Sequence, residues 1–131
     1  MNTDPLLKHL RKRLPDLLAV YLFGSQATGM ATAGSDVDLA VLAPGRVDPL
    51  RLFEIAGELA DLAGASVDLL DLRAASTVMQ YQVIVTGQRL WAVDARVGVF
   101  ESFILSEKTA LDSARSGLLE DIRKEGRVYG R

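Results

Sequence analysis

Two short apolar segments, joined by a glycine-containing loop, constrain the fold more than any other feature of the sequence. The first, 17–23, ends abruptly at Gly24-Ser25, and its length and boundaries predict a strand that is buried on both faces. After ten further residues, Asp36-Val37-Asp38 opens the second segment, 36–42, which is followed by Pro44-Gly45 and predicts another strand. The connection between these strands is too short for a doubly wound nucleotide-binding fold, so we expect a small mixed sheet.

Helical patterns alternate with the strands along the rest of the chain. Helices are predicted over 4–14, 48–63, 76–86 and 96–126, with a third strand over 66–72 and a short edge strand over 90–93. Asp4-Pro5 and Asp48-Pro49 each resemble an N-cap followed by proline at the first helical position. Gly64 and Gly87 are suited to end the second and third helices. This alternation predicts an α/β (α+β) fold, a small mixed β-sheet backed by helices, in a single domain over 1–131.

Apolar stripes predict how two of these helices pack. In the helix over 48–63 one stripe is formed by Leu52, Ile55, Leu59 and Leu62, and it is widened by Phe53, Ala56, Ala60 and Ala63. In the last helix four apolar residues lie seven positions apart, at Val97, Ile104, Leu111 and Leu118. The second stripe fits packing on the sheet, and the helix is long enough for its final turns to contact a partner chain.

Composition restricts the classes of function. The 131 residues carry a net charge of −2, so no overall basic field indicates binding to nucleic acid or to a membrane surface. No apolar run approaches the roughly 20 residues that span a bilayer, and the first twelve residues lack the apolar core of a signal peptide. Because cysteine is absent, disulfides and thiolate metal sites are excluded. The expected location is the cytoplasm.

Paired aspartates in the second strand indicate metal chemistry. Residues i and i+2 of a strand face the same side, so Asp36 and Asp38 can both point into one site and hold Mg²⁺. Two such ions can bind the attacking and leaving oxygens of an in-line displacement at phosphorus. A third carboxylate is available on the next strand from Asp68 or Asp71, which face opposite sides of the sheet, so only one of them can join the site.

Gly24-Ser25 lies where the first strand ends, which suits the binding of a triphosphate. Backbone N–H groups and the Ser25 hydroxyl can donate hydrogen bonds to phosphate oxygens there, and a glycine allows the phosphate to approach the backbone. Clustered carboxylates also repel one another, so their pKa values should rise in the absence of metal and fall when cations bind. One of the clustered carboxylates is then suited to act as the general base for an acceptor hydroxyl.

The segment from Gly24 to Gly29 together with 35–42 resembles the core motif of the DNA polymerase β-like nucleotidyltransferase superfamily. The short chain and the segment 67–72 resemble its minimal nucleotidyltransferases, the MNT proteins. The resemblance implies two Mg²⁺ ions on Asp36 and Asp38, Asp68 as the third carboxylate, ATP as the donor and triphosphate binding at Gly24 and Ser25. It also implies a structural role for Asp71 and an antitoxin function. The partner would be a helical HEPN ribonuclease toxin, and AMP would be transferred to one of its tyrosines.

One position departs from the family pattern, and two alternative functions remain open. Thr28 stands where many relatives carry a basic residue, and Arg46 or Arg73 are candidates to replace its contact with the triphosphate. The first alternative function is nucleotidyl transfer to a small molecule of the aminoglycoside type. The second is a non-catalytic antitoxin that neutralises its partner by binding alone.

Overall fold

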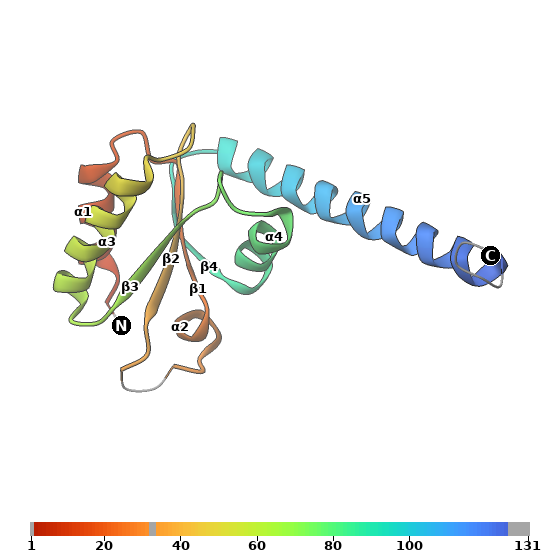
Figure 1. The fold of residues 1–131 in the computed structure, drawn as a ribbon. Helices are drawn as coiled ribbons and strands as arrows, with labels where there is room; N and C mark the ends of the chain where they lie inside the picture. The colour runs from red at the N-terminus through yellow and green to blue at the C-terminus, as the bar shows by residue number, and fades with distance from the viewer. Residues whose placement is uncertain (1, 32–33, 126–131) are drawn as a thin grey trace.

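The protein, described from a computed structural model, is built on a four-stranded mixed sheet with helices on both faces (Figure 1). The structure describes residues 2–31 and 34–125. The strands are β1 (Ala19–Phe23), β2 (Val37–Leu42), β3 (Val67–Asp71) and β4 (Gln88–Ala92). The helices are α1 (Asp4–Arg13), α2 (Ser25–Thr28), α3 (Pro49–Ala63), α4 (Thr77–Thr86) and α5 (Arg96–Glu125). The expected α/β class is therefore confirmed, and each predicted strand and helix is present.

The sheet has the strand order β3-β2-β1-β4, so β3 and β4 form its two edges. β1 pairs antiparallel with both β2 and β4, whereas β2 and β3 are parallel. The parallel pair follows from the sequence, because α3 connects the two strands and returns the chain to the end of the sheet where β2 begins. Strand β4 is the edge strand that the sequence predicts.

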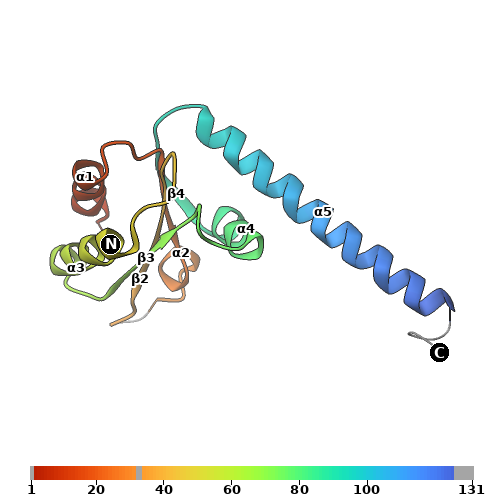
Figure 2. The ribbon, with the colours of Figure 1, turned by 45° about the horizontal axis from the view of Figure 1, so that its top comes forward.

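One face of the sheet is covered by α1 and α3, as the two ribbon views agree (Figures 1 and 2). Buried side chains from both helices pack there against alternate residues of the strands: Leu6, Leu10, Ile55 and Leu59 against Val20, Leu22, Val37, Leu39 and Val41. Asp48 caps α3 by accepting a hydrogen bond from the Arg51 N–H at 3.2 Å, and Gly64 ends this helix in the left-handed conformation. Both ends of α3 are as predicted.

Two details of the predicted helices are wrong. Asp4 is the first residue of α1 rather than its cap, and Thr3 occupies the cap position, because proline is tolerated throughout the first helical turn and does not fix the boundary to one residue. In α3, Leu62 is 52% exposed and Phe53 is 78% exposed, although both were expected in the buried stripe. The reason is that α3 packs over β3 at the edge of the sheet, where the helix buries only the narrow stripe centred on Ile55 and Leu59.

The opposite face of the sheet is covered by α4 and the first turns of α5. Ser76 caps α4 by accepting a hydrogen bond from the Met79 N–H, and Gly87 follows the helix as predicted. The Tyr21 hydroxyl, buried in the sheet, donates a hydrogen bond to Glu101 at 2.6 Å and thereby ties α5 to β1. This face also carries Asp38 and Asp68, because both alternate with residues that point toward α3.

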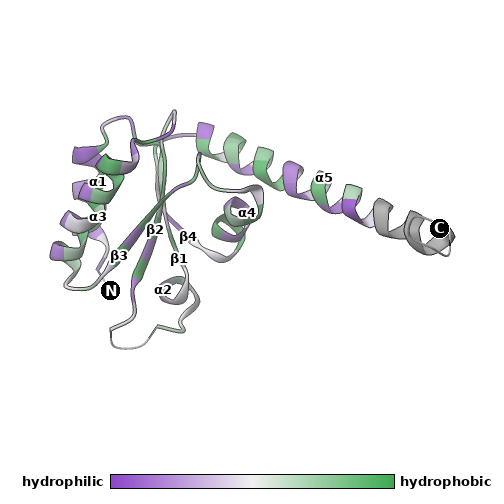
Figure 3. Cartoon of the chain, in the orientation of Figure 1, coloured by the Kyte–Doolittle hydropathy of each residue, from purple (hydrophilic) through white to green (hydrophobic). Residues whose placement is uncertain are grey.

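Helix α5 continues far beyond the sheet (Figures 1 and 2). Of its predicted stripe, Val97 and Ile104 are buried, Leu111 is 38% exposed, and the side chain of Leu118 lies outside those that the structure describes. Apolar residues recur along the part of α5 that is coloured by hydropathy in Figure 3. Within the described part of the chain, no helix is long and apolar enough to cross a membrane.

Candidate active site

Strand pairing brings the predicted carboxylates together at one end of the sheet. Asp38 in β2 lies directly opposite Asp68 in the parallel register with β3. Asp36 is exposed and comes one residue before β2 begins. Asp38 and Asp68 belong to neighbouring strands, and Asp68 is exposed at the sheet edge while Asp38 is half-buried.

The pKa of the Asp38 carboxyl group is raised above its usual value. Burial raises its pKa first, and the neighbouring Asp68 raises it further, both by its charge and by a side-chain hydrogen bond. The charge of Asp36 adds to the same shift of the Asp38 pKa. These causes match the repulsion that the sequence predicts for clustered carboxylates without a cation. They also show that Asp36 and Asp68 both act electrostatically on one central group.

Gly24, which follows β1, leaves room for the Asp38 side chain beside its backbone. Its backbone has φ +71° and ψ −152°, a conformation that is essentially restricted to glycine. A Cβ atom at this position would overlap Oδ2 of Asp38 and lie 3.2 Å from its Cγ. The absence of a side chain at Gly24 therefore lets the Asp38 carboxylate occupy the space beside the Gly24 backbone. Ser25 follows Gly24 as the first residue of α2.

Asp71 lies on the other face of the sheet and is 4% exposed. Its carboxylate accepts hydrogen bonds from the N–H of Val47 at 2.8 Å and the N–H of Arg73 at 3.0 Å. These bonds hold the loop after β2 and the turn after β3. Of the two acids that the third strand offers, only Asp68 lies beside Asp38.

Neither arginine proposed as a substitute at Thr28 lies near the carboxylates. Arg46 and Arg73 follow the last residues of β2 and β3, whereas Asp38 and Asp68 lie near the first residues of these strands. The Arg73 Nε donates a hydrogen bond to the Ala43 carbonyl at 2.8 Å, and its guanidinium lies over the Phe100 ring. The sequence hypothesis that these arginines compensate at the triphosphate is therefore wrong for the observed geometry.

The carboxylates offer the oxygen ligands that hard cations prefer, although they are not preassembled into a metal site. Within 2–31 and 34–125, no three His, Asp or Glu side chains converge closely enough to form a ready ligand cluster. Oxygen ligands are nevertheless what Mg²⁺ prefers, and a cation between Asp38 and Asp68 would relieve the repulsion that raises the Asp38 pKa. The residues present therefore fit Mg²⁺, with Asp36, Asp38 and Asp68 as its available protein ligands.

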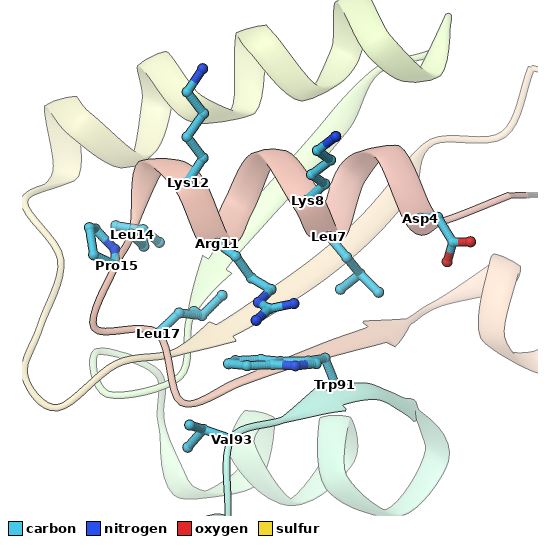
Figure 4. Close-up of a pocket in the computed structure, with 10 residues that line it drawn as sticks. All are labelled: Asp4, Leu7, Lys8, Arg11, Lys12, Leu14, Pro15, Leu17, Trp91 and Val93. Carbon is cyan, nitrogen blue, oxygen red and sulfur yellow. The ribbon is translucent and has the colours of Figure 1, made fainter.

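A cavity of about 730 Å³ lies elsewhere, between α1 and the edge strand β4 (Figure 4). The Arg11 guanidinium covers the Trp91 ring there at 4.7 Å from the ring centroid, and Lys8 and Lys12 lie on the same helix. Asp4 is the only carboxylate among its lining residues. This cavity lacks the paired acids of metal-assisted phosphoryl chemistry, so the carboxylates at β2 and β3 remain the candidate centre.

Comparison with known proteins identifies the family of the chain. The family model described as polymerase beta, nucleotidyltransferase, matches residues 6–96, which contain β1 to β4 and all three aspartates. The chain belongs to this family. The nucleotidyltransferase is also 36% identical over 122 residues to the protein adenylyltransferase MntA of Shewanella oneidensis, covering 93% of this chain and 88% of that protein.

Solved structures give the same fold over nearly the whole chain. One is a toxin–antitoxin with AMP-PNP, which matches with a TM-score of 0.83 and 36% identity over 94% of this chain and 99% of that chain. Another is the tri-AMPylated Shewanella oneidensis HEPN toxin in complex with its MNT antitoxin, with a TM-score of 0.75 and 34% identity over 92% of this chain and 94% of that chain. The nucleotidyltransferase fold predicted from the sequence is confirmed, and α5 belongs to the part that these relatives share.

Proposed function

We propose that this nucleotidyltransferase is an antitoxin that transfers AMP from ATP to a tyrosine of a cognate HEPN ribonuclease toxin. The observation that carries the proposal is the pairing of Asp38 with Asp68 beside Gly24, with Asp36 acting on the same carboxyl group. The similarity to a protein adenylyltransferase over 93% of this chain supports a protein as the acceptor.

Each residue of the centre has a role in this proposal. Asp36, Asp38 and Asp68 would hold two Mg²⁺ ions, which would neutralise the triphosphate and polarise the reacting phosphoryl group. Gly24 and Ser25 would donate hydrogen bonds to the triphosphate oxygens from the end of β1. Asp68 is the exposed member of the carboxylate pair and would accept the proton of the acceptor hydroxyl.

The transfer step is a displacement at the α-phosphorus of ATP. The tyrosine oxygen forms a bond to this phosphorus as its proton passes to Asp68, and the bond from the phosphorus to the α–β bridging oxygen breaks. Pyrophosphate leaves, and the toxin keeps an AMP group on its tyrosine. Burial and the neighbouring carboxylates raise the pKa of Asp38, and a bound cation would lower it again, so Mg²⁺ would favour the ionised form of this carboxyl group.

Helix α5 is the proposed contact surface for the partner chain, within a single domain over 1–131. Val99 is 71% exposed and Phe103 is 58% exposed, although both lie in the turns of α5 that pack near the sheet. They are four residues apart and therefore lie on one side of the helix. Exposed apolar residues on one helical face are typical of helix–helix association, which an all-helical toxin can provide.

Labelled ATP tests the proposed chemistry. The protein is incubated with Mg²⁺, an extract of host cells and ATP labelled at either the α- or the γ-phosphate. We expect one protein band that is labelled by α-labelled ATP only when the protein is added, and no corresponding added band from γ-labelled ATP. The variant Asp36→Ala/Asp38→Ala should lose the signal, whereas Asp61→Ala, an exposed acid on α3, should retain it. An unchanged signal with the double variant would exclude this centre, and labelling of small molecules alone would indicate the aminoglycoside-type alternative.

A further inference from the structure

The cavity between α1 and β4 lies apart from the aspartate centre (Figure 4). Trp91, which lines it, packs against the core that α1 and α3 cover. Asp38, by contrast, alternates with its strand neighbours onto the face that α4 and α5 cover, together with Ala40 and Leu42. The residues that line the cavity include none of those assigned to the centre. A ligand bound there would therefore occupy a site of its own.

The wall that α1 contributes to this cavity is basic. It is formed by residues that recur at helical spacing: Asp4, Leu7, Lys8, Arg11 and Lys12. Three of them are cations and one is a carboxylate, although the whole chain has a net charge of −2. Among the described residues, none of these three cations has an ion-pair partner within 4.0 Å, whereas Arg13 of the same helix pairs with Glu58. The cavity therefore offers unpaired positive charge to an anionic ligand.

An aromatic ring lies beside these cations. The Arg11 guanidinium is 4.7 Å from the centroid of the Trp91 ring, as Figure 4 shows, and Leu7 borders the same space. Arg11 is exposed, so a second planar ring can stack on its guanidinium. The volume of about 730 Å³ is within the range of small-molecule sites, roughly 300–1,000 Å³. The lining thus fits a ligand that joins a planar ring to an anionic group.

From this lining we infer that the α1–β4 cavity binds a nucleoside phosphate as a mononucleotide. Its base stacks on Arg11 beside Trp91, and its phosphate oxygens accept hydrogen bonds from Lys8 and Lys12. Asp4 can accept a hydrogen bond from a ribose hydroxyl or a base amine. The inference is independent of the proposed adenylyl transfer, because the two sites share no residue.

The lining favours a mononucleotide over a nucleic-acid strand. Nonspecific binding of a strand requires a charged groove that follows the backbone over several nucleotides. The three cations of this cavity come from little more than one turn of a single helix, 8–12. They match the phosphate groups of one nucleotide.

Tryptophan fluorescence tests this inference, because Trp91 is the only tryptophan of the chain. The variant Asp36→Ala/Asp38→Ala, in buffer without Mg²⁺, is titrated with ATP, adenosine and inorganic tripolyphosphate. We expect ATP to change the fluorescence saturably, and adenosine and tripolyphosphate each to bind about tenfold more weakly, because each lacks either the phosphates or the ring.

Calorimetry with further variants in the same background provides the Kd without relying on Trp91. Arg11→Gln should raise the Kd for ATP about tenfold. Arg11→Lys keeps the charge but not the planar group, so it should weaken ATP binding and leave tripolyphosphate binding unchanged. Arg115→Gln is the matched control, because Arg115 is exposed on α5 outside the cavity, and its Kd should equal that of the background. Thermal unfolding of each variant verifies that it is folded.

Three results would overturn the inference. Equal Kd values for ATP and tripolyphosphate would show a site for simple anions that makes no use of the ring. Tighter binding of a short RNA oligonucleotide than of ATP would show a nucleic-acid surface. Binding of ATP by the wild type but not by the double aspartate variant, with no effect of Arg11→Gln in the wild type, would place the nucleotide at the aspartate centre alone.

Discussion

Replacing Gly24 by alanine tests the link between the backbone at the end of β1 and the carboxylate of Asp38. Gly24 has φ +71° and ψ −152°, and an added Cβ would overlap Oδ2 of Asp38. Two costs follow from this geometry. The backbone must hold a conformation that non-glycine residues avoid, and the Asp38 side chain must rotate away from the position where it faces Asp68.

The backbone cost alone is about 1–3 kcal/mol of the free energy of unfolding. For a chain of this length each kcal/mol lowers Tm by roughly 3–6 °C, so Gly24→Ala should melt roughly 3–18 °C below the wild type. The loss of transfer should be larger than this destabilisation explains. Removing a single group that stabilises developing charge commonly reduces kcat by about 10²–10³-fold, and we expect a loss of this order per folded molecule.

The assay combines thermal unfolding with transfer from α-labelled ATP at a temperature where all variants are folded. Gly64→Ala is the control, because Gly64 also has a positive φ, +68°, but its added Cβ would meet no atom within 4 Å. This control should lose stability of a similar size and retain transfer. Full activity of folded Gly24→Ala, or an equal loss in Gly64→Ala, would refute the reasoning that Gly24 is required to position Asp38.

Three further predictions follow from the same structure. Asp38→Asn removes a carboxyl group whose pKa is raised, so the variant does not lose the stability that the wild type loses as pH rises through this pKa. In metal-free buffer the Tm of the variant, relative to the wild type, should therefore increase from pH 4 to pH 8, and a Tm difference that does not change with pH would contradict the repulsion. Mg²⁺ should raise the Tm of the wild type in a concentration-dependent manner but not that of Asp36→Ala/Asp38→Ala, and an equal rise in both would place the ion elsewhere. Asp71→Ala leaves the N–H groups of Val47 and Arg73 without their acceptor, so urea titrations should show a loss of about 1.5–3 kcal/mol in the free energy of unfolding. AMP transfer per folded molecule should be retained, and its loss in the folded variant would indicate that Asp71 acts at the site.

The centre of the fold could be predicted because its signals are local. The apolar segments set β1 and β2, strand alternation placed Asp36 and Asp38 on one side, and the offset of three separated Asp68 from Asp71. The glycine requirement at Gly24 could also be expected, although the sequence did not show that the atom in contact belongs to Asp38. Each of these inferences depends on neighbours within one strand or one turn.

The surfaces could not be predicted because they depend on which elements become neighbours. Phe53 belongs to an apolar stripe in the sequence, yet it is exposed because α3 packs at the sheet edge. An apolar stripe that spans about half of the helix circumference cannot all face one strand, so residues at its margins, such as Phe53, stay exposed. The sequence offers Arg73 as a candidate to bind the triphosphate. The parallel pairing of β2 and β3, however, places Arg73 at the opposite end of the sheet from Asp38.

The central claim is that neutralisation of the partner depends on covalent transfer by the aspartate centre rather than on binding alone. The most direct measurement is the intact mass of the toxin after it is co-purified from cells that express it with the wild-type antitoxin or with Asp36→Ala/Asp38→Ala. The account predicts a toxin that carries one or more AMP groups with the wild type, and an unmodified toxin with the double variant, which still co-purifies but no longer protects the cells. An unmodified toxin in both samples, with cells protected equally, would contradict the account and establish an antitoxin that acts by binding.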